Sequence, residues 1–243
     1  MAARLASLLA TILLPGRARA GAWLLHEGLR IVPSVVRNND WLGPLAKSFP
    51  TTKNEVWLTI DDGPTPGQTP GILNALDNAG ARASFFVIGR KVDWNRPLCR
   101  TIVDAGHTLE NHTYSHPSAL FWTLPACAMR AEIVRCNHAI HVASGRAPHW
   151  FRSPAGMTNA CVHPAAARAW LKVAGWSASG LDGIPGGEPE KTVRCIMRNL
   201  TPGGIIVIHE GPGRRVIETL EILLAQLGQH GFRTVIPDRS QFP

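Results

Sequence analysis

Short apolar runs alternate with longer amphipathic segments beyond residue 54 of this chain. The apolar runs predict strands at about residues 56–60, 83–88, 107–111, 149–152, 173–178, 204–208 and 233–236. The longer segments predict helices at about residues 70–79, 97–105, 125–143, 163–172, 189–199 and 214–229. Because strands and helices alternate, the pattern predicts a mostly parallel sheet with helices packed against its outside. It leaves open whether the sheet closes into a barrel.

The pattern is different before the first predicted strand. Residues 5–14 form an apolar run that is too short to span a bilayer. One interpretation is a signal peptide with its cleavage site at Ala18-Arg19-Ala20. The other is an uncleaved segment, residues 1–37, that lies peripherally in the headgroup layer of a membrane. Both interpretations favour an exported, cell-envelope or membrane-peripheral protein over a plainly cytoplasmic one.

The domain boundary is expected at residues 38–54, which are polar and rich in turn-forming residues. Residues 1–53 then form an N-terminal extension, and residues 54–243 form one domain. With 45% hydrophobic residues, the chain of 243 residues is long enough to bury one sizeable core.

The positive charge of the chain is concentrated in the extension. The net charge is +8, but residues 1–53 hold seven Lys or Arg against two Asp or Glu, whereas residues 54–243 hold eighteen against fifteen. A nucleic-acid groove across the domain needs basic residues clustered on its own face, so this class of partner is excluded. The five cysteines have no Cys-x-x-Cys spacing, which excludes a zinc ribbon and favours reduced thiols, with one or two disulfides left open.

Two adjacent carboxylates, Asp61 and Asp62, follow the first predicted strand and precede a Gly-Pro break. Side chains at the carboxyl end of a strand face the loops, where α/β proteins build their sites. Because neighbouring carboxylates repel each other, a divalent cation bound by one of them is the simplest way to keep both ionised. The alternative is an ordinary Asp-Asp-Gly-Pro turn.

Two histidines, His112 and His116, follow another predicted strand. Histidines four residues apart lie on the same face of a helical turn, which suits two nitrogen ligands on one metal. The zincin motif is excluded, because Thr113 stands where that motif needs a glutamate. Together with Asp62, the pair would complete a metal-binding face that leaves positions open for water and substrate. Taken alone, the spacing also fits histidines without a metal.

Three further polar residues stand at predicted strand ends. Arg152 can pair with a carboxylate and keep it ionised, although it also fits a solvated surface charge before a turn. His209 ends an apolar strand and is a candidate acid or base, and Asp182 is a candidate to raise its pKa.

The order of these motifs resembles that of a known family. The chain carries TIDDGP at 59–64, HTYSH at 112–116, RSPAG at 152–156, SGLDG at 179–183 and IVIH at 206–209. This series is similar to TFDDGP, HxxxH, RxPxG, DxxDW and LxxH, the five motifs of the polysaccharide deacetylase superfamily, also called the NodB-homology or carbohydrate esterase family 4 group. The resemblance covers residues 55 to about 238. It implies an α/β fold, an irregular (β/α) barrel of about seven parallel strands.

The resemblance also implies a role for each matching residue. Asp61 would be the general base, held by Arg152, and His209 would be the general acid, tuned by Asp182. A divalent metal ion would be bound by Asp62, His112 and His116, with Zn²⁺ as the first expectation and Co²⁺, Ni²⁺ or Fe²⁺ left open by this donor set. The backbone N–H of Ala155 would stabilise the oxyanion.

Three departures from the family motifs indicate an altered substrate pocket. Ala155 replaces an aromatic residue, Ser179 replaces the first acid of the fourth motif, and Gly183 replaces its tryptophan. Most of the tryptophans are expected to pack in the core. The candidates for substrate contact close to the motifs are Tyr114, Trp150 and Trp176.

The expected function is that of a metal-dependent hydrolase that removes N-acetyl groups from an amino-sugar glycan, cutting a non-peptide amide bond. Its expected partner is an N-acetylated glycan. One alternative is a deformylase or deacetylase of a lipid-linked or membrane-bound sugar, and another is an esterase of O-acetylated glycans. The alternative outside enzymes is an inactive carbohydrate-binding relative.

Overall fold

The computed structural model describes residues 18, 20, 22–23, 31–180, 182–183 and 186–242. The apolar run at residues 5–14, and with it the choice between signal peptide and membrane anchor, lies outside the described residues. Among the described residues, no helix has the length and hydropathy needed to cross a membrane.

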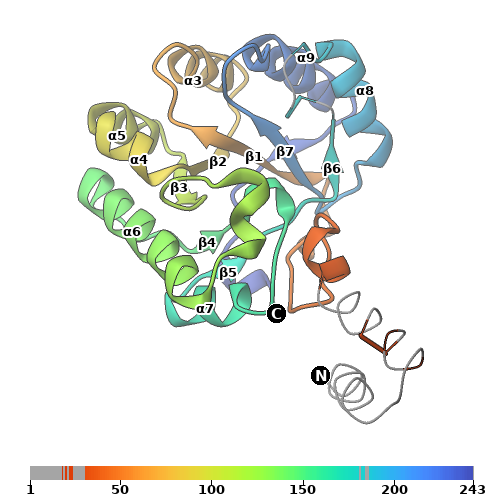
Figure 1. Cartoon of the computed structure of the whole chain (residues 1–243). Coiled ribbons are helices and arrows are strands. Elements are labelled where there is room, and N and C mark those ends of the chain that lie inside the picture. The colour runs from red at the N-terminus through yellow and green to blue at the C-terminus, as the bar shows by residue number, and fades with distance from the viewer. Residues whose placement is uncertain are drawn as a thin grey trace.

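The centre of the fold is one curled parallel sheet with helices around its outside (Figure 1). Its strands are β1 (Glu55–Gly63), β2 (Ala83–Val87), β3 (Thr108–Asn111), β4 (Trp150–Phe151), β5 (Lys172–Val173), β6 (Ala178–Ser179) and β7 (Ile205–His209). Their order across the sheet is β5-β4-β3-β2-β1-β7-β6, and β8 (Arg233–Thr234) pairs with the start of β1. The predicted α/β class with about seven parallel strands is confirmed, and the sheet forms a half-barrel that is open between β5 and β6.

The helices form the outer layer. They are α3 (Thr69–Asn78), α4 (Gly89–Trp94), α5 (Arg96–Asp104), α6 (Ala126–Ser144), α7 (Val162–Arg168), α8 (Pro189–Asn199) and α9 (Val216–Gln229). Short 3-10 turns lie at η1 (Ser118–Thr123), η2 (Pro154–Gly156) and η3 (Arg239–Gln241). The helix α4 was not predicted, because its six residues are too few to show an amphipathic repeat.

Strand β1 lies in the middle of the sheet and is buried from Val56 to Gly63. An almost unbroken apolar run is typical of a parallel strand that is covered on both faces. The polar group of Trp57 is satisfied inside the sheet, since its indole Nε1–H donates to Ser84 Oγ at 2.8 Å. The apolar run therefore fixes β1 in the centre and delivers the two acids that follow it to one edge.

The inside of the half-barrel is filled by aromatic side chains. Phe242 contacts Phe49, Trp57 and Trp150, with the ring centroids of Trp150 and Phe242 4.5 Å apart. Trp57 also contacts Phe86. The larger apolar cluster lies between the other face of the sheet and the helices, and includes residues of α3, α5, α6, α8 and α9. The core thus has two layers, separated by the sheet.

The prediction of one strand at residues 173–178 is wrong, because this stretch contributes to two short strands, β5 and β6, at opposite edges of the sheet. The chain leaves β5 to pair with the extension: Ala46 N–H donates to Val173 O at 3.0 Å, and Gly175 N–H donates to Ala46 O at 2.8 Å. Phe49 N–H then donates to Gly203 O at 2.9 Å, just before β7. Backbone pairing with the extension therefore fills the open side of the half-barrel, which a pattern of single residues does not reveal.

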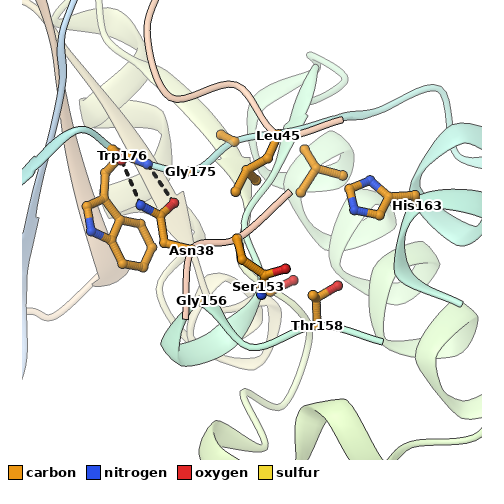
Figure 2. A pocket seen from close by; sticks show the side chains of 11 residues that line it. Asn38, Leu45, Ser153, Gly156, Thr158, His163, Gly175 and Trp176 are labelled. Carbon is orange, nitrogen blue, oxygen red and sulfur yellow. Dashed lines mark hydrogen bonds between the residues drawn. The ribbon is translucent and has the colours of Figure 1, made fainter. Parts of the chain in front are cut away.

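The segment before the expected boundary at residue 54 is consequently packed on the barrel and is not a free linker. Figure 2 shows Asn38 beside Trp176, joined by two hydrogen bonds. Asn38 Nδ2 donates to Trp176 O at 2.7 Å, and Trp176 N–H donates to Asn38 Oδ1 at 3.1 Å. A Cβ at Gly175 would lie 2.3 Å from Asn38 Oδ1, so this close approach requires glycine. The division into residues 1–53 and 54–243 stays a prediction.

Candidate active site

The carboxyl ends of four strands, β1, β3, β4 and β7, bring most of the predicted site residues together. Asp61 in β1 is in register with His209 in β7, and Asn111, the residue before His112, pairs with Phe151, the residue before Arg152. Parallel strands end at the same edge of a sheet, so residues that are far apart in the sequence meet there.

The predicted metal ligands converge. Asp62 Oδ1 lies 3.2 Å from His116 Nε2 and 3.5 Å from His112 Nε2. The three residues each offer one ligand atom, all within 4.8 Å of one another. Asp62 Oδ1 is buried and has no hydrogen-bond donor among the described residues. Because a buried carboxylate oxygen without a donor is costly, this atom fits a divalent cation between the two histidines.

The histidines are held in the form that a metal requires. His112 Nδ1 lies 2.9 Å from the carbonyl oxygen of Arg152, which makes Nδ1 the protonated nitrogen and leaves the lone pair on Nε2. Burial lowers the pKa of His116 to about 4, so that its ring is neutral at pH 7.

The two histidines converge through a loop, and not through the helical turn that their spacing suggested. Thr113 and His116 have positive φ angles of 69° and 54°, which no helix contains. Side chains support this backbone, because Thr113 N–H donates to Asn111 Oδ1 at 2.8 Å and His116 N–H donates to Thr113 Oγ1 at 3.1 Å. Strained backbone at ligand positions is typical of functional sites.

Asp61 is paired with Arg152. Arg152 Nη1 lies 2.7 Å from Asp61 Oδ1 and also donates to Thr59 Oγ1, while its Nη2 donates to Gly175 O at 2.8 Å. Arg152 is 1% exposed and its guanidinium lies over the Phe86 ring at 4.1 Å. These contacts exclude the solvated surface charge that the sequence left open, and they fix one oxygen of Asp61. The other oxygen, Oδ2, lies 3.8 Å from His112 Nε2.

His209 and Asp182 form the second predicted pair. His209 Nδ1 lies 3.1 Å from Asp182 Oδ2, which also accepts the backbone N–H of His209 at 2.6 Å. Burial lowers the pKa of His209, but the hydrogen bond and charge of Asp182 outweigh it and, with Asp61 and Asp62 nearby, raise the pKa above its usual value. The protonated ring is therefore favoured, with Nε2 as the nitrogen that is not used by Asp182.

Both Asp61 and His209 line one cavity of about 310 Å³. Its lining includes the metal-ligand candidates, Asp61 and His209, together with Ala155, Trp176, Ser179, Gly183, Arg37 and Arg214. Ala155 has φ of 54°, in the left-handed region that is unusual for alanine. The backbone is therefore strained at the predicted oxyanion position.

Two of the residues predicted to contact substrate lie outside the lining of this cavity. The Tyr114 hydroxyl donates to Asp93 Oδ2 at 3.2 Å, and its ring is covered by Arg135. Trp150 packs in the aromatic core inside the half-barrel. Neither residue lines the cavity, so among the three aromatic candidates only Trp176 does.

Sequence reasoning missed Arg37 and Arg214. Arg37 comes from the extension, and Arg214 from the loop between β7 and α9. The signal for Arg214 was its place five residues after His209, in a loop that leaves a strand bearing a site residue. No comparable signal marks Arg37, because its position depends on how the extension docks.

Residues 49–174 match the family model for polysaccharide deacetylase. The chain belongs to the polysaccharide deacetylase family. Its NodB-homology domain is similar to curated relatives and to solved structures. A peptidoglycan-N-acetylglucosamine deacetylase of Bacillus cereus is 29% identical over 201 residues, which cover 81% of this chain and 72% of the relative. A chitooligosaccharide deacetylase of Bradyrhizobium sp. is 32% identical over 191 residues, covering 73% of this chain and 86% of the relative.

Solved structures of the family superpose on this chain. A family 4 carbohydrate esterase from Streptomyces lividans, in complex with acetate, has a TM-score of 0.69 and 32% identity, covering 76% of this chain and 93% of the other. A family 4 pseudoenzyme from Bacillus anthracis has a TM-score of 0.71 and 27% identity, covering 79% and 66%. Because the family includes a pseudoenzyme, membership alone does not show that a chain is active. The activity of a member depends on its site residues.

Proposed function

We propose that this member of the polysaccharide deacetylase family is a metal-dependent hydrolase that removes N-acetyl groups from an amino-sugar glycan. The observation that supports this most directly is the convergence of Asp62 Oδ1 with His112 and His116, next to an Asp61 held by Arg152. The peptidoglycan and chitooligosaccharide deacetylases among the relatives support the amide of an N-acetylated sugar as the bond that is cut.

The residues divide the chemistry between the two sides of the cavity. A divalent cation held by Asp62, His112 and His116, with Zn²⁺ as the first choice and Co²⁺, Ni²⁺ or Fe²⁺ compatible with the donor set, supplies Lewis acidity and a lowered pKa of water. Asp61 accepts one proton from the attacking water, whose oxygen forms the new bond to the acetyl carbon. The backbone N–H of Ala155, a residue of the cavity lining, donates to the oxyanion.

His209 completes the reaction on the other side. Its pKa is raised by Asp182, so it carries a proton at Nε2 and donates it to the sugar nitrogen as the carbon–nitrogen bond breaks. Acetate and a free amine leave. Each proton thus has a residue that takes or gives it, with Asp61 on one side of the carbonyl and His209 on the other.

The extension favours a second candidate, a deacetylase of a lipid-linked or membrane-bound amino sugar. Ile31, Val32, Val36 and Trp41 are exposed on the segment that brings Arg37 to the cavity, and Trp41 is 61% exposed. Apolar side chains beside basic residues suit the headgroup layer of an anionic membrane. We therefore propose an exported or membrane-peripheral protein whose cavity lies close to the membrane surface.

The test is acetate release from N-acetylated chitooligosaccharides and from peptidoglycan fragments, with and without a chelator. Asp62→Asn and His112→Ala should each lose both bound metal and activity, whereas His138→Ala, which removes an exposed histidine from α6, should lose neither. Full activity of the metal-free His112→Ala protein would refute the proposal. Glycan binding without any acetate release would instead support the inactive carbohydrate-binding relative.

Parallel assays decide which acyl group is removed and whether the sugar is carried on a glycan or on a lipid. Formate release from an N-formyl sugar would identify a deformylase, and acetate release from an O-acetylated glycan would identify an esterase, because the attacked carbonyl is alike in all three. A preference for the same amino sugar presented on a lipid would favour the membrane-bound candidate.

A further inference from the structure

Each of the two adjacent carboxylates has its own arginine. Arg152 pairs with Asp61, and Arg214 pairs with Asp62: Arg214 Nη1 lies 2.6 Å from Asp62 Oδ2. We infer that Arg214 is the residue that positions the metal-binding carboxylate, turning Asp62 so that Oδ1 alone faces the two histidines. This inference rests on the proposed metal site and adds to it a residue that the five family motifs do not contain.

The two oxygens of Asp62 are in opposite situations. Oδ2 accepts a short hydrogen bond from Arg214, whereas Oδ1 has no donor among the described residues and lies 3.2 Å from His116 Nε2. A carboxylate turns about the bond to its Cβ unless a partner holds one oxygen. Because the guanidinium occupies Oδ2, the carboxylate presents Oδ1 as a single ligand atom. Partners of this kind orient metal ligands and tune the metal.

Further hydrogen bonds hold the Arg214 guanidinium in place. Its Nη1 also donates to Glu210 O, and its Nη2 donates to Gly183 O at 3.0 Å. The side chain is 18% exposed, and it bridges the loop after β7 to the loop that contains Gly183. Three of the five N–H donors of this guanidinium are therefore engaged by protein acceptors. These contacts favour a positioning role over a substrate contact.

The loop that carries Arg214 is itself fixed. The Gln68 side chain donates to Gly211 O at 3.0 Å and to Arg214 O at 3.1 Å, and it accepts Gly211 N–H at 2.7 Å. Gly211 has φ of +142°, and a Cβ there would lie 2.9 Å from Arg214 Nη1. The glycine therefore leaves room for the guanidinium, and Gln68 joins the loop to the start of α3, close to Asp62 in the sequence.

The charge of Arg214 has a second consequence at the same place. Asp61 and Asp62 are buried side by side, at 2% and 8% exposure, and two unneutralised carboxylates repel each other. One guanidinium on each carboxylate offsets this repulsion.

The experiment measures Co²⁺ binding by the whole protein, followed by its visible absorption and by competition with a chelator. In Arg214→Ala we expect the Kd for Co²⁺ to rise about 10- to 100-fold, as is usual when a partner of a metal ligand is removed. The absorption bands should change, because a freed carboxylate can bind through both oxygens. The value of kcat should fall while KM for an N-acetylated oligosaccharide stays within about twofold, and Arg214→Lys should restore part of the loss.

The matched control is Arg215→Ala, which removes the same charge one residue along the loop. Arg215 is exposed and pairs with Glu218, so its loss should leave the Kd and the spectrum unchanged. Should Arg214→Ala fold poorly, as judged by its thermal melt, Gln68→Ala serves as the second variant. It keeps the arginine but loosens its loop, and a smaller rise in the Kd is expected.

The outcomes separate the inference from the proposed function. If the wild type binds Co²⁺ no better than Asp62→Asn does, the metal site itself fails. If the wild type binds Co²⁺ and Arg214→Ala binds it equally well or more tightly, only the positioning role is overturned. A rise in KM alone, with the Kd for Co²⁺ unchanged, would also overturn it and would make Arg214 a substrate contact.

Discussion

One wall of the cavity consists of the ends of β1, β3 and β4, whereas a second wall consists of loops and the extension. Asp61 and His112 on the first wall are almost fully buried, as is Arg152, and these three residues share hydrogen bonds across three strands. On the second wall, Arg37 is exposed and Gly183 presents no side chain.

This difference separates the chemistry from the recognition of the substrate. Reacting groups need fixed positions, which neighbouring strands supply, because strand register cannot shift by less than a residue. Loops carry recognition and tolerate replacement. All three departures from the family motifs line the cavity from loops or strand tips, outside the buried cluster of acids, histidines and Arg152. Substitutions should therefore have their largest effects on the first wall and progressively smaller ones on the second.

The largest effect is expected for Arg152→Gln. The change leaves Asp61 as a buried carboxylate without its cation, and breaking a buried ion pair typically costs about 3–5 kcal/mol. Chemical denaturation of the variant should show this loss of unfolding free energy. Its kcat should fall roughly 100-fold or more, since Asp61 is no longer held in place. Arg215→Gln, an exposed arginine, is the control, and equal stability of the two variants would contradict the buried role of Arg152.

Asp182→Asn should produce the next largest effect, in the pH profile. Asp182 raises the pKa of His209, so removing its charge lowers that pKa. Because His209 acts in its protonated form, activity is lost as pH rises through its pKa, and the alkaline limb of kcat should move to lower pH. Near pH 8 the variant should retain about 1% to 10% of wild-type kcat, with a smaller deficit near pH 5. An alkaline limb that stays in place would remove His209 from the role of general acid.

The first wall was largely predictable from the sequence, and the second was not. Asp61, Asp62 and Arg152 on this wall, like His209 on the neighbouring strand β7, each stand at the end of an apolar strand, and parallel strands must bring such residues to one edge. The positions follow from strand periodicity, which a sequence displays directly. The loop of His112 shows the limit of local reasoning, because its spacing suggested a helical turn while side-chain hydrogen bonds hold a strained loop instead.

The second wall depends on contacts between distant segments. Ala46 pairs with Val173 and Gly175, which splits one expected strand into two and brings Arg37 to the cavity. Neither consequence follows from the polarity of residues 38–54, which is the same for a linker and for a docked segment. Arg214 was missed for a related reason. Its role depends on a contact with the second oxygen of Asp62, and no pattern along the chain indicates that contact.

Gly183→Trp tests the substrate wall and should have a moderate effect. A Cβ at this position would lie 3.5 Å from His209 Cε1, an ordinary contact, so the backbone accepts a side chain there. The indole would restore an aromatic surface beside the general acid, which should raise kcat/KM for chitooligosaccharides about 2- to 10-fold, mainly through KM. Gly183→Ala is the control for the backbone. A loss of activity with both variants would mean that the open position itself is needed by the natural substrate.

The smallest effect is expected for Arg37→Ala, and its direction depends on the substrate. Arg37 is exposed and makes no ion pair or hydrogen bond within the described part of the chain, so a neutral chitooligosaccharide should be deacetylated with unchanged kcat and KM. An amino sugar carried on a lipid phosphate brings a negative charge to the cavity that Arg37 lines. Losing this surface cation should then lower kcat/KM by at most about fivefold, and the decrease should be smaller at high salt. Steady-state assays of both substrates at two salt concentrations make the comparison, with Co²⁺ affinity expected to stay at the wild-type value. A fall in kcat on the neutral substrate would place Arg37 with the buried machinery of the first wall, and the contrast between the two walls would then no longer hold.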